Sequence, residues 1–183
     1  MEQGGGHRLR FLPLLAVLVM VQGPARETSA PHVRGVNDYS QWLVDAALER
    51  SPTVVDLDRR LERTDVTVYV RTDMVDSRFE SHTRLIGAGQ RRYVMISLSK
   101  SMPPARKIEL LGHELQHVVE IATDPRARDA DSLRALFARI GEEHARNHFE
   151  TAQARQAAES VRVEVAQAEP LATAWERPYS RKR

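Results

Sequence analysis

The 183-residue sequence contains no cysteine, few aromatic residues and almost no net charge, and each absence excludes a class of function. Without cysteine the chain forms no disulfide or thiolate metal site, so any metal must rest on histidine and carboxylate ligands. Aromatic residues make up only 5% of the chain, too few for stacking platforms that bind bases or sugars. Lysine and arginine total 27 against 25 acidic residues, so we expect no nucleic-acid partner.

Long hydrophobic runs are scarce as well, and the clearest one lies near the start of the chain. Residues 11–21 carry no charge and follow a segment that contains Arg8 and Arg10. This pattern is typical of a secretory signal peptide, which we place at residues 1–30. Eleven helical residues rise about 16 Å, less than the ~30 Å of a bilayer core, so we expect no stable membrane span after signal cleavage. The protein is thus predicted to be secreted or periplasmic, with anchoring by an uncleaved signal as the alternative.

Residues 31–168 are predicted to form a single domain, followed by a basic disordered tail over residues 169–183. Apolar residues recur at helical spacing in two early segments, alternate with polar residues in the next three, and return to helical spacing afterwards. This order predicts an α+β fold, in which a small antiparallel or mixed sheet precedes a long helix and further C-terminal helices. The expected helices cover roughly residues 42–48, 52–61, 104–122, 132–140 and 142–165, and the expected strands residues 66–71, 79–86 and 92–99.

The expected helix at 104–122 contains the one motif that carries chemistry, His113-Glu114-Leu115-Gln116-His117. Two histidines at i and i+4 lie on one helical face, close enough to hold one metal ion. Zinc suits neutral imidazole ligands and lowers the pKa of a bound water to about 7. Glu114 follows the first histidine and is placed to accept the proton of that water as a general base. The alternative is a pair of core histidines without a metal.

This motif and its uncharged flanks resemble the active-site helix of the zincin metallopeptidases. The resemblance implies Zn²⁺ as the cofactor, a peptide or protein as the substrate, and a sheet that precedes the helix. It also implies that an edge strand of the sheet pairs with an extended peptide, and the strand at 93–98 has the matching position in the chain. The likeness rests on the motif and on the order of elements over roughly residues 66–165.

The third zinc ligand decides which zincin subclass the chain resembles. Metzincins have a histidine six residues after the second motif histidine and a methionine turn downstream. Here Thr123 takes that position, and all five methionines precede the motif. The resemblance is therefore to gluzincins, whose third ligand is a glutamate on a later helix. Glu150 is the expected ligand and Glu143 the alternative, because Glu150 opens an apolar stripe on the expected last helix, continued by Ala154, Ala157, Val161 and Val165.

The function predicted from these residues is that of an exported zinc-dependent metallohydrolase, a peptidase in which activated water attacks a peptide carbonyl. His113, His117 and Glu150 would hold the zinc, and Glu114 would activate the water. Glu120 shares a face with the histidines, and we expect it to orient a ligand rather than to bind the metal. The alternative is a non-catalytic binding protein that keeps the zincin scaffold with a structural or vestigial metal site.

Overall fold

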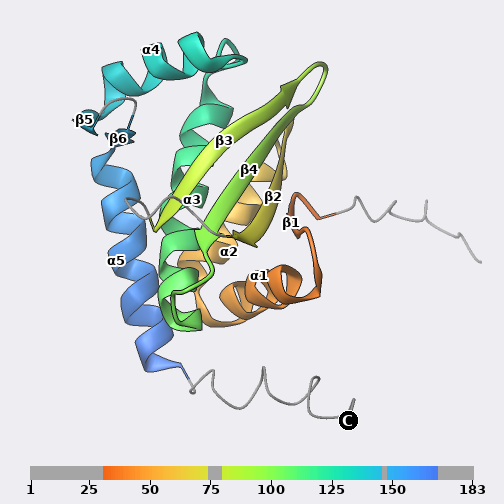
Figure 1. The fold of residues 1–183 in the computed structure, drawn as a ribbon, viewed down its shortest axis with the longest axis vertical. Helices are drawn as coiled ribbons and strands as arrows, with labels where there is room; N and C mark the ends of the chain where they lie inside the picture. The colour runs from red at the N-terminus through yellow and green to blue at the C-terminus, as the bar shows by residue number, and fades with distance from the viewer. Residues whose placement is uncertain (1–30, 74–79, 146–147, 169–183) are drawn as a thin grey trace, which may run out of the picture. The chain divides into compact units, whose positions relative to one another are not determined.

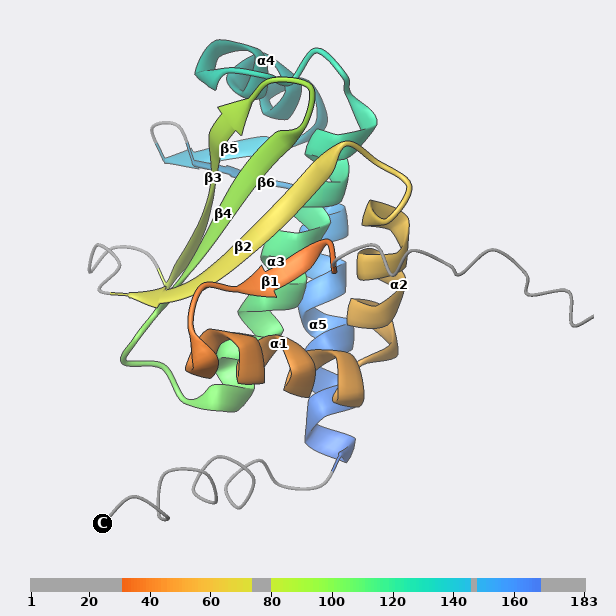
Figure 2. The same ribbon diagram turned by 90° about the vertical axis from the view of Figure 1, so that its right-hand side faces the viewer.

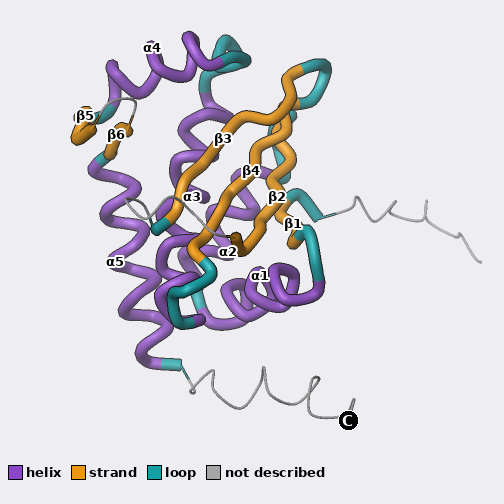
Figure 3. Tube along the Cα trace, in the orientation of Figure 1, coloured by secondary structure: helices purple, strands orange, loops and turns teal. Residues whose placement is uncertain are grey.

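The computed structural model describes residues 31–73, 80–145 and 148–168. They form an α+β fold with a small mixed sheet, as predicted (Figures 1 and 3). The predicted signal peptide and the predicted tail lie outside the described residues. Of the helices described, none is both long and apolar enough to cross a membrane. The elements are β1 (Val33–Gly35), α1 (Asp38–Arg50), α2 (Pro52–Leu61), β2 (Val66–Asp73), β3 (Ser81–Ala88), β4 (Arg92–Ser99), α3 (Pro104–Thr123), α4 (Ala130–Ile140), β5 (Glu142–Ala145), β6 (His148–Glu150) and α5 (Ala152–Gln167).

The main sheet has the strand order β1-β2-β4-β3. The β1–β2 and β2–β4 pairs are parallel, and β3 and β4 form an antiparallel hairpin with a bulge between Leu85 and Gly87. The prediction that the strand at 93–98 is an edge strand is wrong, because β4 lies between β2 and β3. Chain order does not fix spatial order here: β4 returns from the hairpin and pairs in parallel with β2. The edge strand next to β4 is therefore β3, which also contacts α3.

Helix α3 packs against one face of this sheet and lies between the sheet and α5 (Figure 2). Alternation along the strands explains the packing, since every second residue of β2 and β4 points to the same face. Val68 and Ile96 from the sheet and Leu111 and Leu115 from α3 belong to one core and are fully buried. Because α3 is covered on two sides, it is a long apolar helix at the centre of the fold.

Small residues allow α5 to approach α3 closely. A Cβ atom added at Gly112 would lie 2.5 Å from Cγ2 of Val161, far inside van der Waals contact. The predicted apolar stripe of the last helix is buried along its length, namely at Ala154, Ala157, Val161 and Val165. The close contact between these two helices sets the distance between the motif and the segment that precedes α5.

The start of the last helix differs from the prediction. Residues 142–145 and 148–150 form the two antiparallel strands of a β5–β6 hairpin, and α5 begins only after Thr151. The Thr151 side chain accepts a hydrogen bond from the Ala154 backbone N–H at 3.1 Å and is the N-cap of α5. The sequence between Gly141 and α5 has no proline or glycine to mark a break, so the helical spacing of Glu150 was coincidental. Glu150 is the last residue of β6 and not a helical residue.

Side-chain caps explain where the early helices begin. Asn37 accepts a hydrogen bond from Ser40 N at the start of α1. Ser51 does the same for Val54 N at the start of α2, with Pro52 at the first helical position. The sequence did not indicate a further contact at this end of α2, in which Glu164 of α5 accepts hydrogen bonds from Thr53 N and Oγ1. A carboxylate at a helix N-terminus is favourable, so α5 stabilises α2 as well as α3.

Candidate metal centre

The two motif histidines lie on one face of α3 and come close together. Their rings are 4.8 Å apart between centroids and meet edge to face. The His117 side chain is almost fully buried, whereas the His113 side chain is 17% exposed. This difference places the open side of the histidine pair toward His113.

Glu150 is brought to the same place by β6. Its Oε2 atom lies 3.7 Å from Nε2 of His113. Among the described residues, His113, His117 and Glu150 form the one group of three whose ligand atoms all lie within 4.8 Å of one another. The other carboxylate oxygen of Glu150, Oε1, is buried and has no hydrogen-bond partner among the described residues. A buried carboxylate oxygen that lacks a donor fits a cation at this point, because burial without compensation is costly.

The β5–β6 hairpin carries Glu150 into position. Glu142 pairs with Glu150 across the two strands. Gly141 precedes the hairpin, and a Cβ atom there would lie 2.8 Å from the Glu150 carbonyl oxygen. Only glycine permits this backbone approach. Glu143, the alternative third ligand, is exposed on β5 opposite Phe149 and does not join the histidines.

Glu120 lies one turn beyond His117 and contacts its ring. Oε2 of Glu120 is 2.9 Å from Nδ1 of His117, and its other oxygen accepts hydrogen bonds from Thr151 and Gln116. Burial lowers the pKa of His117, but the hydrogen bond to Glu120 and the nearby carboxylates outweigh it, so the pKa lies above its usual value. Burial alone would raise the pKa of Glu120, but the hydrogen bonds from His117 and Thr151 outweigh this effect, so the pKa of Glu120 lies below its usual value. Because Nδ1 of His117 contacts Glu120, Nε2 is the ring nitrogen that remains for a metal ion.

Glu114 points from α3 to the edge strand. Ser81 Oγ donates a hydrogen bond to its Oε1 atom and Thr83 Oγ1 to its Oε2 atom, each at 2.6 Å. The residue is only 4% exposed, so these two hydroxyl groups supply much of its solvation. No local sequence pattern indicates this arrangement, because Ser81 and Thr83 precede Glu114 by 33 and 31 residues.

A cavity of about 500 Å³ opens beside the histidines and Glu114. Its walls come from β3, α3, α4 and Phe149 of β6. The α4 side of the cavity combines Arg134 with apolar residues: Phe137 meets the His117 ring edge to face at 5.3 Å and stacks on Phe149 at 6.3 Å. The remaining apolar lining residues are Leu85, Ala88, Ile121, Ala130 and Leu133.

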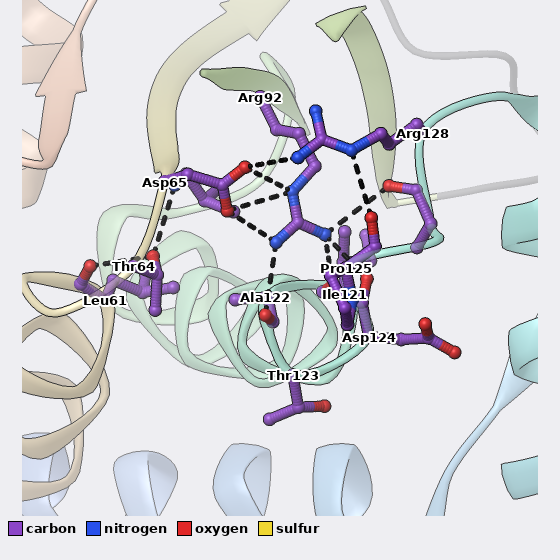
Figure 4. A network of polar contacts seen from close by, with 12 residues as sticks. Leu61, Thr64, Asp65, Arg92, Ile121, Ala122, Thr123, Asp124, Pro125 and Arg128 are labelled. Carbon is purple, nitrogen blue, oxygen red and sulfur yellow. Dashed lines mark hydrogen bonds and ion pairs between the residues drawn. The ribbon is translucent and has the colours of Figure 1, made fainter. Parts of the chain in front are cut away.

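The wall that continues from α3 into α4 is held by one buried arginine, Arg92, at the start of β4 (Figure 4). Its side chain donates to the carbonyl groups of Ile121, Ala122 and Asp124, at distances of 2.6–3.1 Å. It also forms an ion pair with Asp65 at 2.6 Å. The last carbonyls of a helix lack intrahelical partners, and Arg92 supplies the missing donors. No local sequence pattern marks Arg92 as buried, although it is only 1% exposed.

Three of the five predicted site residues, His113, His117 and Glu150, thus come together, while Glu114 lines the cavity beside the histidines and Glu120 contacts His117. Reasoning from the sequence missed Ser81, Thr83 and Thr151, which hold Glu114 and Glu120. Comparison with protein-family models, with curated proteins and with solved structures found no match to this chain. The site must therefore be interpreted from its own geometry.

Proposed function

We propose that the protein is a zinc-dependent metallohydrolase of the zincin type, with a glutamate as third ligand, that cleaves peptides. The observation that carries the proposal is the convergence of His113, His117 and Glu150. One buried oxygen of Glu150 has no hydrogen-bond partner among the described residues, and Glu114 lines the cavity beside the two histidines. Two imidazoles and one carboxylate are the ligand set of many catalytic zinc sites, in which a fourth position stays open.

Each residue has a distinct role in this proposal. A zinc ion held by His113, His117 and Glu150 would supply Lewis-acid activation of a water molecule and of the substrate carbonyl. Glu114 accepts a proton from the attacking water and passes it to the leaving amine, which requires a carboxylate beside the reacting groups. Glu120 fixes the ring orientation of His117 through Nδ1, a role that carboxylates often have beside metal-binding histidines.

The surroundings of the site favour an extended peptide as the substrate. The outer edge of β3 has no paired strand among the described residues, and β3 lines the cavity. An extended peptide can add to such an edge through main-chain hydrogen bonds. The apolar side chains of Leu133, Phe137 and Phe149 would then contact a large apolar side chain of the substrate, next to the bond that is cleaved.

A second candidate is a binding protein with a structural metal, and one observation favours it. Both carboxylate oxygens of Glu114 already accept hydrogen bonds from hydroxyl groups of β3. Such a tie is also what a purely structural glutamate would make between a helix and a sheet. In this case the protein would bind zinc and a peptide without turnover.

Zinc content and peptide cleavage separate the two candidates. We expect the purified protein to hold one zinc per chain by mass spectrometry, the His113→Ala variant to lose it, and the His82→Ala variant, also in the cavity wall, to keep it. Glu114→Gln should keep the zinc and lose cleavage of a quenched fluorescent peptide library by a factor of roughly 100 or more. Zinc without any cleavage by the unaltered protein would favour the binding protein, and absence of zinc would refute both.

Export belongs to the same proposal but rests on the sequence alone. Residues 1–30 would direct the chain out of the cytoplasm and then be removed. N-terminal sequencing of protein recovered from the medium or periplasm tests this, since a chain that still starts at Met1 would contradict cleavage.

A further inference from the structure

The two hydroxyl groups that hold Glu114 lie on the same face of the edge strand. Ser81 and Thr83 are two residues apart, so both side chains point from β3 toward α3. The backbone hydrogen-bonding groups of β3 lie in the plane of the sheet instead. One strand therefore presents hydroxyls to Glu114 and, at its outer edge, backbone groups to a ligand.

We infer that Ser81 and Thr83 are positioning residues that hold Glu114 for proton transfer, an inference that rests on the proposed function. Each carboxylate oxygen has two lone pairs, and each hydroxyl uses one of them. The second lone pair of each oxygen stays available for the proton of the attacking water. The hydroxyls thus fix the carboxylate without blocking its reaction.

The geometry also couples the base to the bound peptide. A peptide that adds to the outer edge of β3 would have its position fixed by the same strand that fixes Glu114. A small error in the distance between a base and its reaction partner lowers the rate strongly, because the reactive geometry is narrow. Two short hydrogen bonds to a nearly fully buried carboxylate leave Glu114 little freedom to rotate away.

Substitutions that remove one hydroxyl at a time test this role. In the zinc-loaded full-length protein, with a quenched peptide that it cleaves, we expect Thr83→Val and Ser81→Ala each to lower kcat about tenfold. KM and zinc content should stay unchanged, and Thr83→Ser should restore kcat because it keeps the hydroxyl. The matched control is Thr67→Val on β2, a buried threonine outside the Glu114 contacts, which should leave kcat unaltered. If Thr83→Val fails to fold, Ser81→Ala and Thr83→Ser carry the test.

A measurement on the metal-free protein checks the contact itself. The infrared carboxylate band of Glu114, isolated as the difference between each protein and its Glu114→Gln partner, should move to higher frequency when Thr83 becomes valine. Loss of kcat without this movement overturns the inference, as does an unchanged kcat in Thr83→Val, and the proposed function survives both results. A zinc-loaded wild-type protein that cleaves no peptide overturns the proposed function and the inference together, and a band movement then marks a structural tie.

Discussion

At the scale of single residues, the site depends on carboxylates whose surroundings differ. Glu114 and Glu120 each have both oxygens in hydrogen bonds, whereas one buried oxygen of Glu150 finds no partner in the part of the chain that the structure describes. The first two are therefore satisfied by the protein alone. Glu150 is the carboxylate that gains most from a bound cation.

Replacing Glu150 by glutamine tests this difference. We expect Glu150→Gln to weaken zinc binding roughly 100-fold or more, because a charged ligand is lost, with little loss of folding stability in the metal-free protein. The matched control is Glu143→Gln, on the neighbouring strand, which should leave zinc affinity unchanged. Zinc affinity can be measured by competition with a chromophoric chelator. The assignment is wrong if Glu143→Gln weakens binding and Glu150→Gln does not.

At the scale of elements, the packing of α5 on α3 holds the site together. The contact at Gly112 and Val161 leaves no room for a methyl group, and Val161 is fully buried and β-branched. Its side chain therefore cannot rotate away without a new clash. The two helices would have to separate if the small residue were lost.

Gly112→Ala should accordingly destabilise the protein, although alanine favours helix formation by about 1 kcal/mol over glycine. We expect a net loss of about 1–2 kcal/mol in the free energy of unfolding, from the clash with Val161. Urea denaturation measures this loss, and Val161→Ala added to Gly112→Ala should recover part of it. Gly89→Ala is the control, since no atom lies within 4 Å of a Cβ placed there. Equal effects of the two glycine substitutions would contradict the packing argument.

Most elements could be predicted from the sequence, because their signals are local. Ser51 as N-cap with Pro52 at the first helical position predicts the start of α2, and alternation of apolar residues predicts the strands β2 and β4. The β5–β6 hairpin could not be predicted, since its residues also fit a helical period and Thr151 is a weak signal for a helix start. The order of the strands, the hydroxyls on Glu114 and the burial of Arg92 depend on contacts between distant segments, which no local pattern reports.

At the scale of the whole molecule, the pair Arg92–Asp65 joins the sheet to the end of α3. Hydrogen bonds from Arg92 lower the pKa of Asp65, and the charges of Arg92 and Arg128 lower it further. A carboxylate whose pKa is lowered in the folded state stabilises the fold at pH values above its ordinary pKa of 3.8. This stabilisation is lost as the pH falls through the folded-state pKa. The contribution is therefore present at neutral pH and absent in strong acid.

Asp65→Asn should show this dependence directly. We expect the variant to be less stable than the wild type at about pH 7, and the difference to shrink as the pH falls below 3.8 and through the lowered folded-state pKa of Asp65. Urea denaturation of both proteins across this range provides the measurement. A difference that stays constant with pH would mean that Asp65 acts through packing and not through its charge.

Glu150 and Thr151 are neighbours in the chain, yet they serve different ligands. Glu150 faces His113, and Thr151 donates to the Glu120 that orients His117 while it also caps α5. Successive side chains of a strand point to opposite faces, so a shift of the β5–β6 pairing by one residue would turn Glu150 away from the histidines. Such a slip would leave every residue of the HExxH motif unchanged and still remove the third ligand. The register in which β5 and β6 pair must therefore be kept for Glu150 to face His113.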